Sequence, residues 1–226
     1  MRSVPMIVSI LLLLVSPCAA GEAAFYPPTA YSAQPIQGRV VDATTRQPLE
    51  GVIIVAQWIL YETSVGGQNP RKRLQVLETV TAPDGSYTFS GWGPKPNLWN
   101  LDLAKAYMCC FLTNRDPALD YFKPGYRPLG LENRPDRNTS VRTSDWDGKT
   151  IELEPFHGSV DEWGKAIGFL QTDLNWGNLD WRLYPRMALA IEEERVRHRL
   201  SHLRVSGLGS LGTTREEILR ELERRP

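Results

Sequence analysis

Cysteine and histidine are scarce in this sequence, which holds three of each in 226 residues. It has no CxxC pair and no Cys/His array, so the spacing that typifies a structural zinc site is missing. The GxSxG nucleophile motif is missing too, and all three histidines lie outside the segments in which we expect strands. A serine or cysteine hydrolase needs a histidine close to its nucleophile. The sequence therefore favours a protein that is not an enzyme and has no cofactor.

An excess of charge of one sign is also absent, since 26 Lys and Arg residues balance 26 Asp and Glu residues. Such a balance gives no reason to expect binding to nucleic acid or to an anionic membrane. The run "RKR" at Arg71–Arg73 is a local exception, next to Gly66, Gly67 and Pro70. We interpret it as part of a solvated polar loop over residues 62–73, with an anion-binding loop as the alternative.

The third absence is a hydrophobic run long enough to cross a membrane, which takes about twenty apolar residues. The most apolar stretch, from Met6 to Val15 in "MRSVPMIVSILLLLVSPCAA", is much shorter. A basic residue, a short apolar stretch and small residues after it are typical of a secretory signal peptide. We predict that residues 1–20 are a signal peptide and that the mature chain has no transmembrane segment. The protein would then be periplasmic, secreted or at the cell surface. A lipoprotein modified on Cys18 is the alternative, although Pro17 is an unfavourable residue before a lipidated cysteine.

The mature chain would keep two cysteines, Cys109 and Cys110, which are neighbours in "KAYMCCFLTN". Side chains of adjacent residues in a strand point to opposite faces, so a bond between these two would distort the backbone. We expect two buried thiols, with a strained vicinal disulfide or a bridge between subunits as the alternatives. The sequence leaves open their redox state and the oligomeric state of the protein.

After a linker over residues 21–34, rich in Ala and Pro, short apolar runs alternate with turn residues. The predicted strands are Ile36–Val41, Val52–Tyr61, Leu74–Thr81, Ser86–Trp92, Ala104–Thr113, Ala118–Phe122 and Thr150–Leu153. Between the third and fourth stands Pro83-Asp84-Gly85, a strong hairpin signal. Short strands, frequent turns and no helix between them predict an antiparallel β-sandwich of about seven strands.

Three groups of residues in these strands resemble a known family. They are Ile36-x-Gly38-x-Val40-x-Asp42, Pro48-Leu49-x-Gly51-Val52 and Asp84-Gly85-x-Tyr87-x-Phe89. In order and spacing they resemble the carboxypeptidase regulatory-like domain, which has a transthyretin-like sandwich, and Tyr121–Pro128 is similar to its late strand and turn. The resemblance covers residues 35–155. It implies a Greek-key sandwich that serves as an accessory, stabilising or binding module in exported bacterial proteins, without catalytic residues.

The second predicted strand is apolar on both faces, with Ile54 and Trp58 on one side and Val55 and Ile59 on the other. Strands of this kind are covered on both sides. The cover comes from elsewhere in the chain or from a partner, and the helical extension that we predict over residues 156–226 can supply it. We expect two to three helices, at least two of them packed on the outer face of a sheet in one compact unit.

Local signals place the starts of these helices. Ser159 and Glu162 form a capping box, and Pro185 suits the first turn of a second helix that ends near Leu203. The residues predicted to face inward are Val160, Trp163, Ile167 and Leu170 in the first helix, and Met187, Ile191, Val196, Leu200 and Leu203 in the second. A third, charged helix after Thr213 or Thr214 has only a narrow apolar stripe. The sequence leaves open whether that helix is ordered in the monomer or docks a partner.

The residues best placed to bind a metal are Glu194, His198 and His202. Positions four apart share one face of a helix, so a carboxylate and two imidazoles could converge there. The glutamate base of an HExxH enzyme is missing, and arginines stand nearby. An exposed polar face is therefore our preferred interpretation, and a metal-dependent enzyme ranks last. Some transthyretin-like sandwiches are intradiol dioxygenases with two Tyr and two His on iron, but here every His lies beyond the strands.

Tryptophan is frequent, with seven residues, and Trp92 and Trp99 flank the loop "GPKPNL". Most tryptophans in a small domain are packing anchors, but an exposed pair can stack on a sugar. Our first functional prediction is an exported, non-enzymatic module that binds a protein partner or serves assembly of the cell envelope. The alternative is a glycan or small-ligand binder that uses Trp92 and Trp99. The sequence identifies neither the partner nor the ligand.

Overall fold

The computed structural model describes residues 28–64, 66–97, 109–113, 115–134, 139–175, 180–200 and 215–224. The predicted signal peptide, residues 1–20, lies outside these ranges and stays a prediction.

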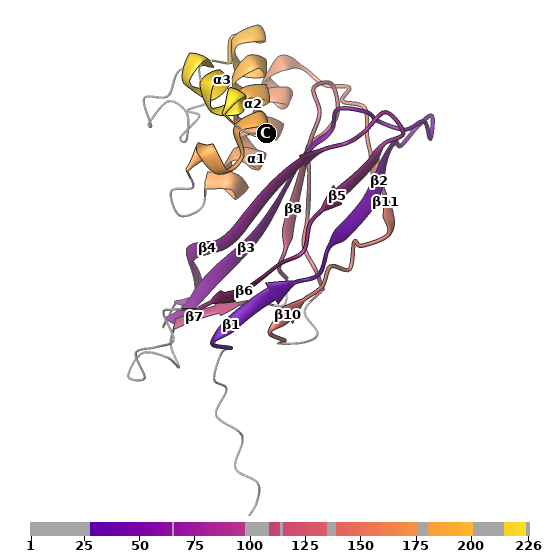
Figure 1. Cartoon of the computed structure of the whole chain (residues 1–226). Helices are drawn as coiled ribbons and strands as arrows, with labels where there is room; N and C mark the ends of the chain where they lie inside the picture. Colours follow the sequence, from indigo (N-terminus) through magenta and orange to yellow (C-terminus); the bar gives the residue numbers. More distant parts are fainter. Residues whose placement is uncertain are drawn as a thin grey trace, which may run out of the picture.

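Eleven strands in this part of the chain form three sheets (Figure 1). Their bounds are β1 (Ala30–Ala33), β2 (Ile36–Asp42), β3 (Ile53–Ser64), β4 (Gly67–Val80), β5 (Ser86–Phe89), β6 (Trp92–Pro96), β7 (Cys109–Leu112), β8 (Ala118–Phe122), β9 (Leu129–Leu131), β10 (Val141–Arg142) and β11 (Lys149–Leu153). The largest sheet has the order β4-β3-β8-β9, with β7 paired to the far part of β3. The other two have the orders β11-β2-β5 and β10-β1-β6.

The sandwich core lies between the sheets, because alternate residues of each strand point inward. Ile54 and Trp58 of β3 point inward and are at most 1% exposed. Val40 and Tyr87 enter the same cluster from β2 and β5. The hydroxyl oxygens of Tyr87 and Tyr121 lie 2.9 Å apart inside it, so neither buried hydroxyl lacks a partner.

Residues of the pattern that resembles the carboxypeptidase regulatory-like domain serve the turns of the sandwich. Asp42 Oδ1 accepts the backbone N–H groups of Thr44 and Thr45 at 2.8 and 2.7 Å, which closes the turn after β2. Gly85 has a φ of +78°, and a Cβ at this position would lie 2.4 Å from the Val40 carbonyl oxygen. Only glycine fits there without strain.

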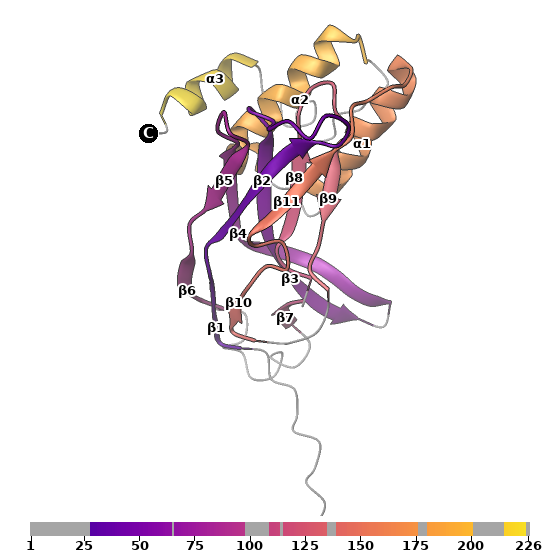
Figure 2. The same ribbon diagram turned by 90° about the vertical axis from the view of Figure 1, so that its right-hand side faces the viewer.

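Helices form a layer on the outer face of the largest sheet, at one end of the sandwich (Figure 1, Figure 2). They are α1 (Val160–Asn175), the short 3-10 helix η2 (Trp181–Leu183), α2 (Pro185–Arg197) and α3 (Arg215–Glu223). Val55 of β3 and Phe122 of β8 are buried in one cluster with Trp163 and Ile167 of α1 and Met187 of α2. The predicted fold class, a β-sandwich with at least two helices packed on the outer face of a sheet, is confirmed.

The two main helices begin as the sequence predicts. The Ser159 N–H donates to Glu162 Oε2 at 2.8 Å, and the Glu162 N–H donates to Ser159 Oγ at 3.3 Å, which completes the capping box. Pro185 is the first residue of α2.

A contact that the sequence did not indicate fixes α2 to the sheet. The N–H groups of Arg186 and Met187 donate to the carboxylate of Glu78 on β4, at 3.1 and 2.8 Å. A carboxylate at this position pairs N–H groups that have no partner within the helix and interacts favourably with the helix dipole. Glu78 therefore anchors the start of α2.

Two residues predicted to face inward are exposed instead. Val160 is 49% exposed, because it is the first residue of α1 and lies before the buried stripe. Val196 is 61% exposed. The inward series of α2 runs through Met187, Ile191 and Glu194, and at helical spacing Val196 falls on the other face.

The prediction of a polar loop over residues 62–73 is wrong. β3 and β4 continue through this region as one hairpin, in which Tyr61 pairs with Pro70 and Thr63 pairs with Gln68. Because β4 is an edge strand, polar residues and a proline without an N–H are tolerated there. Figure 2 shows the hairpin projecting sideways near the end of the sandwich that is remote from the helices.

Two further differences concern the strands. Residues 30–33, predicted as part of the linker over 21–34, form β1 and pair with β6. The pairs β1–β10 and β2–β11 are parallel, whereas we predicted an antiparallel sandwich throughout. Pairing between segments so far apart in the chain leaves no signal in the local alternation of residues.

The third helix belongs to the helical layer. Ile218 of α3 is fully buried in the second cluster, and Arg215 Nη2 lies 3.3 Å from Glu193 Oε1 of α2. Leu203 and the predicted caps Thr213 and Thr214 lie outside the described residues. Within the described ranges, no helix is both long and apolar enough to span a membrane.

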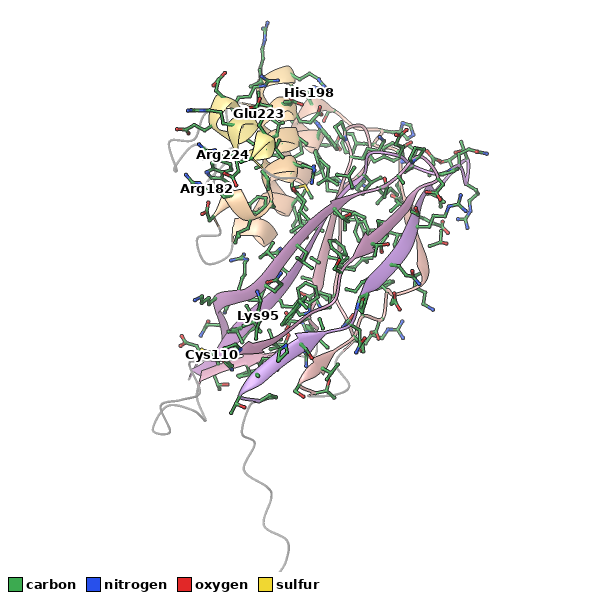
Figure 3. The ribbon with its side chains drawn as sticks, viewed as in Figure 1. Lys95, Cys110, Arg182, His198, Glu223 and Arg224 are labelled. Atoms are coloured by element: carbon green, nitrogen blue, oxygen red, sulfur yellow. The ribbon has the colours of Figure 1, made fainter. Side chains whose placement is uncertain are left out.

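Cys110 is buried in the sandwich core and is disulfide-bonded, so the prediction of two free thiols is wrong for this residue. The prediction relied on a regular strand, but the pairing of β3 with β7 shifts in register between Tyr61 and Glu62. The side chain of Cys109 lies outside the described part of the structure. Figure 3 shows Cys110 at the end of the sandwich remote from the helices.

Candidate functional site: a pocket on the outer face of the sheet

A pocket of about 590 Å³ lies on the outer face of the largest sheet, and we call it the sheet-face pocket. Residues of β3, β4, β8 and β9 form its floor, and α1 contributes to its wall. The lining includes Gln57, Ile59, Tyr61, Gln68, Asp120, Gly130, Glu132 and Phe169. The volume is in the range of pockets that hold small ligands.

The pocket lies where the helices stop covering β3. Ile53 and Val55 point outward and pack under the helical layer, whereas Gln57, Ile59 and Tyr61, further along the same face, line the pocket. From the sequence we expect this apolar face to be covered, by the helices or by a partner. The helices cover only its first part.

The floor of the pocket is a chain of polar groups. Gln57 Nε2 donates to Asp120 Oδ2 at 2.8 Å, and Arg73 Nε donates to Gln57 Oε1 at 2.7 Å. Gln57 and Asp120 are 1% and 3% exposed. Burial lowers the pKa of the Arg73 guanidinium, while the nearby Asp120 carboxylate acts in the opposite direction. Such a buried network is rigid when its members are paired, so the floor is held in one arrangement.

Two aromatic side chains, Tyr61 and Phe169, line the pocket. Phe169 of α1 is 67% exposed, although a ring of this size is normally covered. Tyr61 of β3 is half-buried, and burial raises the pKa of its hydroxyl, which the carboxylates of Asp116 and Glu132 raise further. Glu132 forms an ion pair of 3.6 Å with Arg115 at the surface.

Asp116 supports the floor from inside the sandwich. β8 pairs with β3 up to Gln57 and β7 pairs from Leu60 onward, so Ile59 falls between two partner strands. The Ile59 N–H donates to Asp116 Oδ1 at 2.8 Å, and the Thr113 hydroxyl lies 3.1 Å from Oδ2. Burial raises the pKa of Asp116 to about 7, despite opposing contributions from the Ile59 N–H and the Arg142 guanidinium.

Glu194 and His198, two of the metal candidates, come together in the helical layer, where Figure 3 labels His198. His198 Nε2 lies 3.3 Å from Glu194 Oε2, and the same oxygen accepts the Trp163 indole N–H at 2.9 Å. Arg197 pairs with the other oxygen of Glu194. This buried carboxylate therefore joins α1 to α2. His202 lies outside the described residues, and no group of three metal-ligating side chains occurs within them.

Trp92, a candidate for ligand stacking, lies on β6 and is not part of the lining of the sheet-face pocket. Its ring meets that of Trp58 edge-on, with centroids 5.2 Å apart, and Lys95 Nζ lies 5.9 Å from its centroid. The ring is half-buried and packs against the sandwich core. Trp99 lies outside the described residues, so ligand binding by this pair stays a prediction.

The sequence analysis did not identify the residues of the sheet-face pocket. A signal was present for two of them, since Gln57 and Asp120 are single polar residues in the apolar strands "VIIVAQWIL" and "ALDYF". A polar residue buried in a sheet needs a partner, so these two could have been paired. Arg73 and Phe169 could not be assigned to this pocket from the sequence, because they come from β4 and α1, and only the folded arrangement brings these elements together.

Comparisons with known proteins add little. No family model matches this chain, and no curated protein matches it. Similar solved structures are a 3-chlorocatechol 1,2-dioxygenase from Rhodococcus opacus 1CP (15% identity, TM-score 0.29), a streptococcal ancillary pilin (12%, 0.25) and a hydroxyquinol 1,2-dioxygenase from Pseudomonas putida DLL-E4 (15%, 0.26). The alignments cover 55, 55 and 56% of this chain and 60, 30 and 57% of those chains. This chain thus spans less than two thirds of each, and likenesses this distant carry no argument about function.

Proposed function

We propose that this protein is an exported, non-enzymatic binding module that holds its ligand in the sheet-face pocket. One observation carries the proposal: an exposed aromatic ring, Phe169, stands over a concave site whose floor is a buried polar network of Gln57, Asp120 and Arg73. A mostly apolar pocket with a few fixed polar groups is the usual form of a ligand site.

The residues in the pocket suit binding better than covalent catalysis. The described lining contains no Ser, Cys, Thr, His or Lys, so it offers neither a common nucleophile nor an imidazole base. Its two carboxylates, Asp120 and Glu132, already contact Gln57 and Arg115. Turnover of a bound ligand by the purified protein would contradict this part of the proposal.

Two features support export. The N-terminal residues 1–20 have the composition of a signal peptide. The disulfide at Cys110 fits an oxidising compartment, because disulfides persist outside the reducing cytosol. Membership of the carboxypeptidase regulatory-like family, which the motifs of β2 and β5 suggested, is part of the same proposal.

A second candidate function is docking of a protein partner on the helical layer. Large apolar side chains are exposed there, namely Val160, Phe169, Leu183 and Val196, at 42 to 67%. A partner that spans several elements of this layer could cover these four side chains together. Crosslinking in the cell envelope followed by mass spectrometry tests this function, with a requirement for Phe169 and Val196 as the expected result.

The proposed function is tested by a fragment screen with ligand-observed NMR on the purified protein. We expect fragments that bind wild-type protein and lose binding in Phe169→Ala but not in Val196→Ala. Both variants remove an exposed apolar side chain from the helical layer, at 67% and 61% exposure, so folding effects are matched. Fragments that bind both variants equally, or none that bind at all, would count against the pocket as the functional site.

A further inference from the structure

We infer that the sheet-face pocket takes a neutral sugar ring, as a single sugar or as part of a glycan. This inference rests on the proposed function and names the ligand class of the same site. The site is also different from the one predicted for a glycan from the sequence, which used Trp92 and Trp99.

The hydrogen-bonding groups of the pocket match the hydroxyls of a sugar. Gln57, Gln68, Asp120 and Glu132 line it. Gln57 and Asp120 are almost fully buried and bonded within the floor network, so the amide of Gln68 and the carboxylate of Glu132 are the groups that a ligand reaches first. A sugar hydroxyl donates one hydrogen bond and accepts others, so planar side chains with two polar atoms can bind neighbouring hydroxyls together. The floor network holds Gln57 and Asp120 in place before any ligand arrives, which lowers the entropic cost of binding.

The aromatic residues of the pocket suit the apolar face of a sugar ring. One face of a pyranose carries mainly C–H groups, whose partial positive charge suits the negative face of an aromatic ring. Phe169 and Tyr61 both line the pocket, from α1 and from β3. The 67% exposure of Phe169 leaves most of its surface available for a ligand.

The charges favour a neutral ligand over a charged one. The charged residues of the described lining, Asp120 and Glu132, are both acidic, whereas Arg73 bonds to Gln57 from outside that lining, so an anionic sugar would meet two carboxylates. A cationic ligand would gain little attraction from these carboxylates, because each one has an arginine nearby. Arg73 is linked to Asp120 through Gln57, and Arg115 pairs with Glu132 at 3.6 Å. Hydrogen bonding and stacking therefore decide which neutral ligand binds, while the two carboxylates of the lining disfavour an anionic one.

Isothermal titration calorimetry with cellobiose, maltose, N,N'-diacetylchitobiose and glucuronic acid tests the inference. We expect saturable binding of at least one neutral disaccharide and none of glucuronic acid. Phe169→Ala should weaken binding about tenfold or more, which is the loss of one stacking contact, while Val196→Ala leaves it unchanged.

A second pair of variants tests the polar side of the pocket. Glu132→Gln should change affinity for the neutral sugar by about threefold or more, whereas Glu154→Gln should not. Glu154 is a matched control, because it is exposed and forms an ion pair of the same 3.6 Å length with Arg127, outside the pocket lining.

The outcomes separate the ligand class from the site. If fragments bind in a manner that depends on Phe169 but no neutral sugar does, the sugar inference is wrong and the proposed function stands. A Phe169-dependent protein segment found instead would also refute the sugar inference. If neither fragments nor sugars bind, both fail. A sugar that binds equally well to Phe169→Ala overturns the assignment to this pocket.

Discussion

Replacing Asp116 with asparagine should change how the stability of this protein depends on pH. Asp116 is 3% exposed, and burial raises its pKa from 3.8 to about 7. The folded protein therefore holds a proton on this carboxyl at pH values where the unfolded chain has lost it. For a carboxyl whose pKa rises on folding, the stabilisation is complete below pH 3.8 and is lost as the pH rises through about 7.

The size of the effect follows from the shift. A change of one pKa unit corresponds to about 1.4 kcal/mol, so the rise from 3.8 to about 7 is worth on the order of 4 kcal/mol between those pH values. Asparagine keeps an oxygen to accept the Ile59 N–H, which lies 2.8 Å from Oδ1 in wild-type protein, but it does not titrate.

Urea denaturation at several pH values from 4 to 8 measures how the free energy of unfolding depends on pH in wild-type protein and in the variants. The free energy of unfolding of wild-type protein, relative to Asp116→Asn, should fall by a few kcal/mol across the range. Asp116→Ala should in addition lose about 1 to 3 kcal/mol at every pH, because the buried Ile59 N–H loses its acceptor. Identical pH profiles for wild type and Asp116→Asn, or a wild-type advantage that grows with pH, would refute the reasoning.

Three further substitutions test other parts of the fold. Gly85→Ala should lower the free energy of unfolding by more than about 1 kcal/mol, since φ is +78° and a Cβ would lie 2.4 Å from a backbone oxygen; an unchanged thermal midpoint would contradict this. Glu78→Ala should cost about 1 to 2 kcal/mol in guanidinium denaturation and increase amide exchange at Arg186 and Met187, and unchanged exchange there would show that the cap is unimportant. Trp163→Phe keeps an aromatic side chain, although a smaller one, and removes the N–H donor to Glu194, so urea denaturation should show a loss of about 1 kcal/mol or more. No loss would mean that this hydrogen bond does not stabilise the helical layer.

Sequence patterns predicted those parts of the fold that depend on neighbouring residues. The capping box at Ser159 and the turn at Gly85 are set by a few consecutive residues, so their spacing sufficed. The same reasoning failed for residues 62–73, because a hairpin that projects from the sandwich has no buried face to impose alternation. Hydrophobic spacing also failed in α2, because the buried residue there is the charged Glu194 and the apolar Val196 is exposed.

The candidate site was harder to predict because distant segments build it. Gln57, Arg73 and Asp120 come from three strands and are paired only once those strands align. Phe169 reaches the same pocket from a helix; its position off the stripe of Trp163, Ile167 and Leu170 indicates that it is not a core residue, but not that it meets the sheet at a pocket. The sequence did indicate that the outer face of β3 needs a cover, but not that the cover stops short of Tyr61.

The most direct test of the central claim is a ¹H–¹⁵N NMR titration of the purified protein with the neutral disaccharide that binds best in calorimetry, or with the best fragment if no sugar binds. The account predicts chemical-shift changes concentrated at Gln57, Tyr61, Gly130 and Phe169, around the sheet-face pocket. Changes centred on Trp92 instead, or spread over the surface without saturation, would contradict the claim that this pocket is the binding site.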